Sequence, residues 1–317
     1  MAQLLEKNAE IHALVMENDP LADELPREVR TVNGDVCNES SLRLFFSGAD
    51  RQTCVIHCAG IVSVASHPDD RLSRVNVGGT KNILRFCEES SVGKLVYVSS
   101  VHAIPEKPEG MEITEEAVFS PELVKGEYAK SKAIATALVF DAAKRGLNVS
   151  VVFPSGIIGP GDSGKGSITT MLLSFLAGKL PVAVKGGYDF VDVRDVASGI
   201  IACSEQGMPG RGYILSGNYA SIRDILEAAK KTLRLKRAVS YLPICLAKLI
   251  APVYEKFSIR RRKPAFFTPY AVAVLASNAS FSRKAAAETF GYSPRSLQST
   301  IKDTVLWLKG IKNSRRK

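Results

Sequence analysis

The chain has 317 residues, of which 45% are hydrophobic and 23% are charged, and it carries a formal net charge of +10 at pH 7. This hydrophobic content is ordinary for a globular protein, and no apolar run is long enough to predict a membrane-spanning helix. A chain of this length can hold one large α/β domain with a smaller lobe, or two domains.

The six cysteines include no Cys-x-x-Cys pair, so we expect no metal site. Cys54, Cys58, Cys87 and Cys203 lie in apolar patterns, where a free cysteine behaves as a small hydrophobic residue. No signal peptide is recognisable at the N-terminus. We therefore expect a cytoplasmic protein with reduced thiols.

Much of the positive charge lies in the run Arg260-Arg261-Arg262-Lys263 and in the C-terminal tail. Such runs can attract nucleic acid or an anionic membrane surface. No nucleic-acid-binding motif accompanies the charge, and a solvated face with a frayed tail is the simpler interpretation. We expect a small-molecule substrate, no nucleic-acid partner and no integral membrane segment, and a homodimer is possible.

The N-terminal third predicts strands alternating with helices. Residues 1–10 have the pattern of the end of a helix, and residues 11–16 that of a strand. Strands follow at 29–33 and 53–58, and the second is followed by Ala59 and Gly60. A helix is expected over about 71–87, and it carries Asn76. This alternation is typical of a parallel sheet covered by helices.

The central third contains a candidate proton-transfer pair. Residues 94–98 predict a buried strand that ends in Ser99 and Ser100. Tyr128 and Lys132 stand four residues apart in a good helix former, so they share one face. An ammonium near a phenol lowers the pKa of the phenol, which suits proton transfer at a carbonyl or alcohol oxygen. Alone, this spacing is common by chance and also fits an exposed helix face.

A further strand, at about 148–153, closes at Pro154. A strand, a helical crossover and a second strand form a right-handed parallel unit. Ligands bind such sheets at the carboxyl ends of the strands. The sequence therefore predicts that Ser99, Ser100, Tyr128 and Pro154 converge there.

Several segments, in this order, resemble the extended short-chain dehydrogenase/reductase superfamily, and within it the NAD-dependent epimerase/dehydratase and dihydroflavonol-reductase-like proteins. They are Gly34-Asp35-Val36, Val55-Ile56-His57-Cys58-Ala59-Gly60, Asn76-Val77-Gly78-Gly79-Thr80, Val98-Ser99-Ser100, Tyr128 with Lys132, Phe153-Pro154-Ser155-Gly156-Ile157-Ile158-Gly159-Pro160, and Phe190-Val191-Asp192-Val193-Arg194-Asp195-Val196-Ala197. The resemblance implies a doubly wound parallel sheet of Rossmann type with a smaller C-terminal substrate lobe. It divides the chain into a dinucleotide-binding domain, at 1–155 and about 186–218, and a substrate lobe, at about 156–185 and 219–317.

The resemblance also implies roles for individual residues. Ser100, Tyr128 and Lys132 would be catalytic, with Ser99 in place of Ser100 if the register is shifted by one. Asp35 and Val36 would lie against the adenine, and Asn76 would support the site or simply pack its helix. The implied cofactor-binding residues are Asp35, Val36, Cys58, Ala59, Gly60, Asn76, Val98, Ser99, Tyr128, Lys132, Phe153, Pro154 and Ile157. The cofactor would be NADP or NAD, and Val15 and Met16, where an acid or an arginine often discriminates, specify neither.

One part of the family pattern is missing. The Gly-x-x-Gly-x-x-Gly turn that binds the cofactor pyrophosphate does not precede Ile11. On this resemblance the chain starts inside the first helix and lacks the first strand, which is central in the usual order 3-2-1-4-5-6. We therefore expect residues 11–16 to pair with residues 29–33 and to form no ladder with residues 53–58. We also expect weak cofactor binding by the chain as given.

The C-terminal half predicts helices at 169–177 and 222–233, with Ser221 as the N-cap of the second, and a strand at 212–215. Arg194 and Asp195 are expected to tie the two lobes together. Residues 241–257 are apolar but contain Pro243, Lys248 and Pro252. We favour a helix over the substrate for this segment, and a helix lying on a membrane is the alternative.

The combined interpretation is an NAD(P)-dependent oxidoreductase that reduces a ketone or aldehyde, or oxidises an alcohol, of a small and fairly apolar molecule. Ile104, Met171, Tyr188 and Phe267 are the expected apolar or aromatic residues near the substrate. A sugar-nucleotide epimerase or dehydratase with bound NAD would use the same residues. An inactive, truncated family member is the third alternative, which the missing glycine-rich turn favours.

Overall fold

A computed structural model of the protein describes residues 1–162, 166–261 and 267–314, with side chains described as far as residue 310. The centre is a parallel four-stranded sheet of order β3-β4-β5-β9. Its strands are Cys54–His57, Lys94–Val98, Val149–Pro154 and Gly212–Leu215. All residues of β5 and β9 are buried, which is typical of a parallel sheet covered on both faces.

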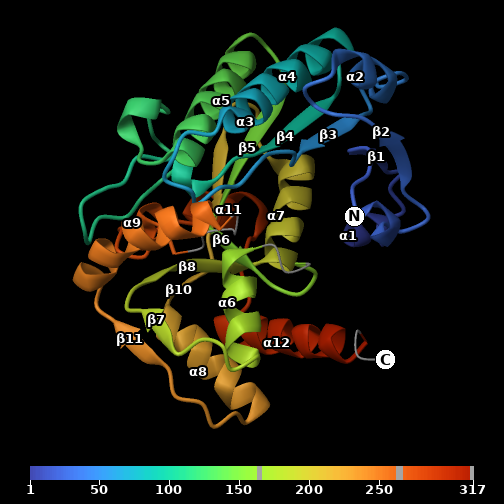
Figure 1. The fold of residues 1–317 in the computed structure, drawn as a ribbon. Coiled ribbons are helices and arrows are strands. Elements are labelled where there is room, and N and C mark those ends of the chain that lie inside the picture. Colours follow the sequence, from blue (N-terminus) through green and yellow to red (C-terminus); the bar gives the residue numbers. More distant parts are fainter. Residues whose placement is uncertain (163–165, 262–266, 315–317) are drawn as a thin grey trace.

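The sheet separates two hydrophobic cores because successive side chains of a strand point to opposite faces. Leu95 and Tyr97 of β4 belong to the core under helices α4 and α5, while Val96 belongs to the core under α7. Figure 1 shows α2, α4 and α5 on one side of the sheet and α7 on the other. The expected α/β architecture of Rossmann type is confirmed.

The helices connect and cover these strands. In the first part of the chain they are α1 (Ala2–Leu5), α2 (Glu39–Phe45), α3 (Asp70–Leu72), a π-helical turn (Ser73–Gly79), α4 (Thr80–Glu89) and α5 (Glu127–Lys144). In the remainder they are α6 (Ser167–Leu176), α7 (Val193–Gln206), α8 (Ile222–Leu233), α9 (Ile244–Arg260), α10 (Pro269–Val274), α11 (Lys284–Phe290) and α12 (Leu297–Ser314). Short 3₁₀ turns occur at Ala22–Glu24, Val101–Ala103 and Pro121–Leu123.

The N-terminal strands form a sheet of their own. Strand β1 (His12–Val15) pairs with β2 (Arg30–Asn33) in parallel, and in the described part of the chain no ladder joins β1 to β3. The expected pairing is therefore confirmed. The pair has a separate small hydrophobic cluster around Ile11, Ala13, Val15 and Val29.

A second group of elements lies beyond the carboxyl ends of the main strands (Figure 1). It contains a three-stranded sheet of order β10-β8-β6 and a parallel pair, β11 with β7. These strands are Asn218–Ser221, Gly187–Asp192, Gly156–Ile158, Ser240–Leu242 and Val182–Val184. Helices α8 and α12 pack against each other and against this sheet. As predicted, Ser221 caps α8, and it does so in a capping box with Asp224.

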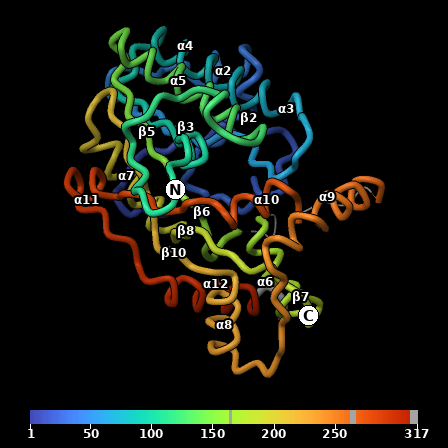
Figure 2. Tube along the Cα trace, turned by 90° about the vertical axis from the view of Figure 1, so that its left-hand side faces the viewer, coloured from blue at the N-terminus to red at the C-terminus, as the bar shows by residue number. Residues whose placement is uncertain are grey.

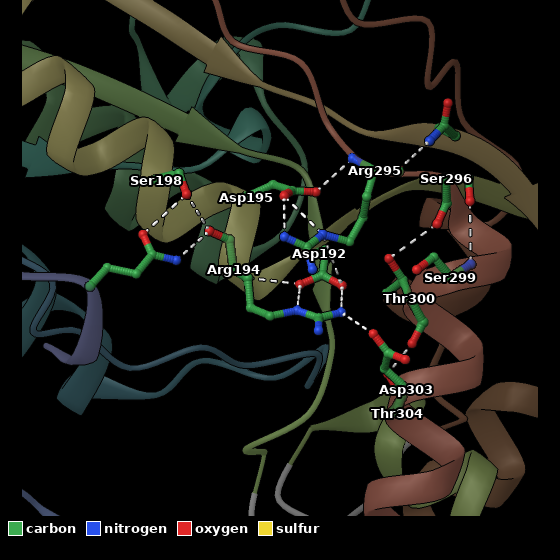
Figure 3. Close-up of polar contacts among 12 residues, drawn as sticks. Asp192, Arg194, Asp195, Ser198, Arg295, Ser296, Ser299, Thr300, Asp303 and Thr304 are labelled. Atoms are coloured by element: carbon green, nitrogen blue, oxygen red, sulfur yellow. Dashed lines mark hydrogen bonds and ion pairs between the residues drawn. The ribbon is translucent and has the colours of Figure 1, made fainter. Parts of the chain in front are cut away.

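A network of charged residues fixes the start of α7 to the C-terminal segment (Figure 3). The Arg194 guanidinium contacts Asp192 at 2.7 Å and Asp303 of α12 at 2.8 Å. Arg295 donates to Asp195 from its backbone N–H and from its guanidinium, at 2.8 and 2.9 Å. The Asp192 side chain has no exposed surface, so the Arg194–Asp192 ion pair is shielded from water on the carboxylate side. Arg194 and Asp195 thus join α7 to residues of the C-terminal helical region.

Candidate functional site

Helix α5 carries the two residues of the predicted proton-transfer pair. It begins after Gly126, whose φ of +94° lies in the region that favours glycine. A Cβ atom at Gly126 would overlap the ring of Tyr270, so glycine is also required for space. From this start, Tyr128 and Lys132 point toward the end of β4, and both are buried. The alternative of an exposed helix face is therefore wrong for this structure.

Lys132 is held under the end of β4. Its ammonium donates to the Val98 carbonyl at 2.7 Å and to the Tyr97 hydroxyl at 3.3 Å, and it lies 4.8 Å from the centre of the Tyr97 ring. Burial lowers the pKa of Lys132 from 10.5 to about 8. The side chain therefore remains mostly charged at neutral pH, at a cost in desolvation.

The Tyr128 hydroxyl lies in an aromatic environment. Burial raises the pKa of Tyr128 to about 12, and a hydrogen bond with Ser100 opposes the rise. The expectation that Lys132 lowers the pKa of Tyr128 is wrong for this structure. The physical reason is that the lysine ammonium is directed to Val98 and Tyr97, while burial disfavours the phenolate. Tyr128 is consequently a neutral phenol at physiological pH.

The two serines at the end of β4 have different partners. The Ser100 hydroxyl lies close enough to Tyr128 to oppose the rise in the pKa of the phenol, and it accepts from the His102 N–H at 3.2 Å. The Ser99 hydroxyl faces α5 instead and lies 2.7 Å from the Thr136 hydroxyl. Of the two registers considered, the structure therefore places Ser100, and not Ser99, beside Tyr128.

Asn76 joins three segments at the site. Its side-chain amide donates to the Ile61 carbonyl at 3.0 Å and to the Ser131 hydroxyl at 2.9 Å, and its oxygen accepts from the Ile61 N–H at 2.7 Å. It is 1% exposed. Asn76 thus fixes the loop that follows β3 against α5, which favours the supporting role over simple helix packing.

Asp35 and Val36 lie at the end of β2, in the other sheet. The Asp35 carboxylate accepts from the Cys37 N–H at 2.8 Å, forming a turn. Val36 is buried against Gly79, where a Cβ atom would overlap it, and its carbonyl accepts from Asn82 at 2.9 Å. Val36 therefore packs beside α4, with Asp35 next to it in the chain. Among the described residues, neither shares a contact partner with Tyr128.

The remaining predicted residues follow the carboxyl ends of three strands. Cys58, Ala59 and Gly60 follow β3 and are exposed. Val98 ends β4 and supplies the carbonyl that Lys132 contacts. Phe153 and Pro154 end β5 and are buried, and Ile157 in β6 is 48% exposed. Because β3, β4 and β5 are parallel neighbours, the residues that end these strands lie along one edge of the sheet, and their part in cofactor binding stays a prediction.

Comparison with known proteins agrees with this geometry. The sequence profile of the NAD dependent epimerase/dehydratase family matches residues 1–216, which is more than half of the chain. The chain belongs to the NAD-dependent epimerase/dehydratase family. The resemblance inferred from the ordered motifs is therefore confirmed.

Two curated relatives cover nearly all of this epimerase/dehydratase family member. The chain is 26% identical over 309 residues to sterol demethylase protein B of Methylococcus capsulatus, covering 96% of this chain and 93% of the relative. It is 28% identical over 316 residues to a putative dihydroflavonol 4-reductase of Synechocystis, covering 96% and 89%. Similarity over whole chains indicates that both lobes are shared with these relatives.

Solved structures show the same fold. The crystal structure of gox2253 has a TM-score of 0.82 at 25% identity, covering 98% of this chain and 94% of that chain. A UDP-glucose 4-epimerase of Thermotoga maritima has a TM-score of 0.79 at 18% identity, covering 98% and 94%. At that identity, the second comparison supports the Rossmann-type fold alone.

The family is NAD-dependent, and the backbone at Gly60 has a feature that fits a bound cofactor. A Cβ atom added at Gly60 would lie 3.2 Å from the Asn76 side-chain oxygen and 3.8 Å from the Lys132 ammonium. The backbone here is therefore free of side-chain bulk beside a buried amide and a cation. Glycine at such a position permits close approach of a ligand to the backbone.

Two residues near Tyr128 were missed at the sequence level. The His102 ring lies 6.0 Å from the Tyr128 ring and stacks on Tyr188 at 5.6 Å, and its Nδ1 lies 3.2 Å from the Tyr270 hydroxyl. Burial lowers the pKa of His102 to about 4, so the imidazole is neutral at physiological pH. A histidine two residues after Ser100 was a usable signal, whereas Tyr270 is 142 positions from Tyr128 and could not be connected to it by spacing.

Proposed function

We propose that this family member is an NAD(P)-dependent oxidoreductase that interconverts a ketone or aldehyde with an alcohol on a small, fairly apolar molecule. The observation that carries the proposal is the proximity of Ser100 to Tyr128, with Lys132 one helical turn away on the same helix. These three side chains are buried at the carboxyl end of the sheet. Ligands of open α/β sheets bind there.

In this proposal each side chain has a separate task. The Ser100 hydroxyl donates a hydrogen bond to the substrate oxygen and orients the carbonyl. Tyr128 is protonated at neutral pH, so it can give its proton to that oxygen as the alcohol forms. The Lys132 ammonium, which in this structure contacts the Val98 carbonyl and the Tyr97 hydroxyl, stabilises the negative charge on the phenol oxygen once it turns toward Tyr128. When bound, the nicotinamide cofactor supplies or accepts the hydride.

The Tyr128 surroundings favour an apolar substrate. Tyr188 and Tyr270 contact His102 with ring centres 5.6 and 6.0 Å apart, and Ile104 is buried nearby in the chain. Because its pKa is raised to about 12, the Tyr128 phenol carries its proton at neutral pH, which is the form that acts as an acid in the reductive direction. The whole-length relative named sterol demethylase protein B supports a fairly apolar substrate for this chain as well.

The site is tested by kinetics with NADH or NADPH and a panel of alicyclic and aromatic ketones. Tyr128→Phe removes the proton donor while keeping the ring, so we expect reduction to slow by roughly 10²–10⁴-fold. Tyr219→Phe is the matched control, because Tyr219 is 63% exposed. Equal activity of the two variants would overturn the role of Tyr128.

The alternative functions are distinguished by the cofactor. A sugar-nucleotide epimerase or dehydratase retains NAD through purification and converts a UDP-sugar with no net consumption of nicotinamide. An inactive family member binds neither nucleotide, and calorimetric titration with NADH and NADPH would detect this. Turnover of a ketone with stoichiometric oxidation of NADPH would support the reductase.

The domain division and the compartment are part of the same proposal. Residues 1–155 and about 186–218 would hold the cofactor, and residues of about 156–185 and 219–317 would enclose the substrate. All six cysteines are free thiols, which supports a cytoplasmic protein.

A further inference from the structure

Helix α9 presents its large apolar side chains to solvent. Leu249 and Val253 are 73% and 69% exposed. Besides Ile259 near the end of the helix, the exposed large apolar residues of α9 are Leu246, Leu249, Ile250, Val253, Tyr254 and Phe257, and we call these six the α9 stripe. Their spacing of three and four residues places them along one face of the helix. Figure 2 shows α9 extending outward from the body of the protein.

The side of α9 that packs on the protein is made of small or polar residues. Ala247 and Ala251 are fully buried and form a cluster with Val272 of α10. Glu255 and Ser258 are also buried on this side. An ordinary surface helix turns its large apolar residues inward. In α9 this arrangement is reversed, and the α9 stripe therefore does not contribute to packing of the fold. A contiguous exposed apolar surface of this kind marks an interaction site.

The exposed charges around the α9 stripe are all positive. Lys248, Lys256, Arg260 and Arg261 are exposed, and the Arg261 guanidinium lies 4.1 Å from the centre of the Phe257 ring. The acidic residue of α9, Glu255, is 7% exposed and accepts from the Ser66 N–H at 2.9 Å. The solvent side of α9 therefore combines an apolar stripe with cations and carries no exposed carboxylate.

We propose that α9 docks the protein on the surface of an anionic phospholipid bilayer. The helix lies in the plane of the interface, with the α9 stripe among the upper acyl chains and the flanking cations at the lipid phosphates. No helix within the described ranges is long and apolar enough to cross a bilayer, so the attachment is peripheral. The apolar side chains of the exposed face would thus contact acyl chains, and its cations would contact phosphates.

A second copy of the chain fits this surface less well. A symmetric contact would place each copy's α9 cations against those of the other copy, because a two-fold interface uses the same patch on both subunits. Lysine is also depleted in protein interfaces. An anionic bilayer supplies the opposite charge along with the apolar phase.

The proposed docking surface borders the candidate site. Glu255 holds the N–H of Ser66, and the Thr268 hydroxyl donates to the Val64 carbonyl. Both contacts are made to the loop that runs on from Ile61, which Asn76 fixes beside Lys132. Docking through α9 would therefore place this loop behind the helix, on the side away from the lipid.

Vesicle flotation of the full chain tests the proposal. With equimolar phosphatidylcholine and phosphatidylglycerol we expect binding that weakens as salt is raised, because exposed charges are screened. With phosphatidylcholine alone we expect little binding. Failure to bind the anionic vesicles at low salt would overturn the proposal.

Substitutions distinguish vesicle binding through the α9 stripe from non-specific hydrophobic adsorption. Leu249→Ser with Val253→Ser should weaken binding at least about tenfold, since it removes two inserted side chains. The matched control is Leu44→Ser with Val118→Ser, at positions 64% and 72% exposed outside α9, and it should bind like the wild type. Lys256→Ala should weaken binding about fivefold at low salt. Circular dichroism verifies that each variant is folded.

The alternative occupant gives a different result. If the α9 stripe joins two copies, light scattering shows a dimer that the Leu249→Ser and Val253→Ser variant converts to a monomer, while flotation shows no lipid binding. That outcome would overturn the lipid proposal. Equal vesicle binding by this variant and by the wild type would also overturn it.

Discussion

The four-stranded sheet and the β1–β2 pair are both parallel, yet they are stabilised very differently. The larger sheet is covered on both faces by α4, α5 and α7, and its strands β5 and β9 are buried along their whole length. The β1–β2 pair has its own small cluster and is largely exposed on β2. It contacts the rest of the fold through a few side chains, among them Gln3, which donates to the Arg194 carbonyl at 3.0 Å, and Lys7, paired with Glu205.

This difference indicates that the two regions need not unfold together. A region with few buried apolar contacts can open locally without loss of the whole fold. Ser100, Tyr128 and Lys132 all lie on the well-covered side, whereas Asp35 follows β2 of the weakly held pair and only Val36 beside it packs in the main core. The proton-transfer end of the site should therefore be rigid, and the end predicted to bind adenine should be more mobile.

The largest contrast is expected from truncating one core residue in each region. Phe153→Ala should lower the free energy of unfolding by about 3–5 kcal/mol, because Phe153 is fully buried and stacks on Phe119. Ile11→Ala should instead speed amide exchange in β1 and leave the main thermal transition nearly unchanged. Calorimetry and hydrogen exchange measure these effects. Equal lowering of the main transition by both would show that the regions unfold as one unit.

The second test uses the buried charge of Lys132. A fall in its pKa from 10.5 to about 8 corresponds to about 3 kcal/mol of destabilisation while the side chain is charged. Between these values the unfolded chain binds the extra proton, so wild-type stability rises with pH through this window. Lys132→Met should therefore be more stable than wild type below pH 8, by up to about 3 kcal/mol.

Chemical denaturation at neutral and at alkaline pH checks this result. The advantage of Lys132→Met should fade as pH approaches 10.5, where the wild-type lysine is neutral in both states. Lys130→Met is the control, because Lys130 is on the same helix with its charge in a partly exposed pair with Glu127. A Lys132→Met advantage that is constant with pH would indicate improved packing rather than loss of a buried charge.

A smaller effect is expected at Asn76. Asn76→Ala leaves the Ile61 N–H and carbonyl and the Ser131 hydroxyl without their partner, which should cost about 1–3 kcal/mol. It should also raise the KM for the cofactor, because the loop at Gly60 loses its anchor. Asn82→Ala, which removes one hydrogen bond to Val36, is the milder control. A cofactor KM unchanged in Asn76→Ala would argue against this supporting role.

The smallest effect is expected where the N-terminal unit meets α7. Gln3→Ala removes two hydrogen bonds, to the Arg194 carbonyl and from the Ser198 hydroxyl, at a partly exposed contact. We expect a change in global stability within about 0.5 kcal/mol. Limited proteolysis should nevertheless cut the first residues sooner than in wild type. A large drop in the melting temperature would show that this contact supports the main sheet.

Local patterns were sufficient for much of the fold. The strand at 212–215 and the helix at 222–233 have the predicted bounds, because each has clear period and end signals. The 71–87 helix was predicted as one element but is interrupted by a π-helical turn that contains Asn76. A π turn depends on one extra backbone residue, which side-chain periodicity does not reveal.

The site was only partly accessible from the sequence. Tyr128 and Lys132 could be paired because their spacing is local, and Ser100 could be added through the order of strands. The pKa of Tyr128 could not be derived, since it depends on burial by residues from distant segments, including Tyr270. The exposed orientation of α9 was likewise hidden, because an apolar helix has the same composition whether its large residues face inward or outward.

Gly126 has a consequence for substitution tolerance. Gly48 and Gly126 have almost the same φ, +92° and +94°, but only Gly126 has a neighbour in the way of a side chain, the ring of Tyr270. In a site-saturation library, Gly48 should therefore accept asparagine or aspartate, which tolerate positive φ, whereas Gly126 should reject them as firmly as it rejects valine. All substitutions at Gly126 should be lost from the library to a similar extent, whatever the amino acid. If asparagine and aspartate variants are lost more often at Gly126 than at Gly48, the difference measures the steric contribution of Tyr270 separately from the cost of the backbone conformation.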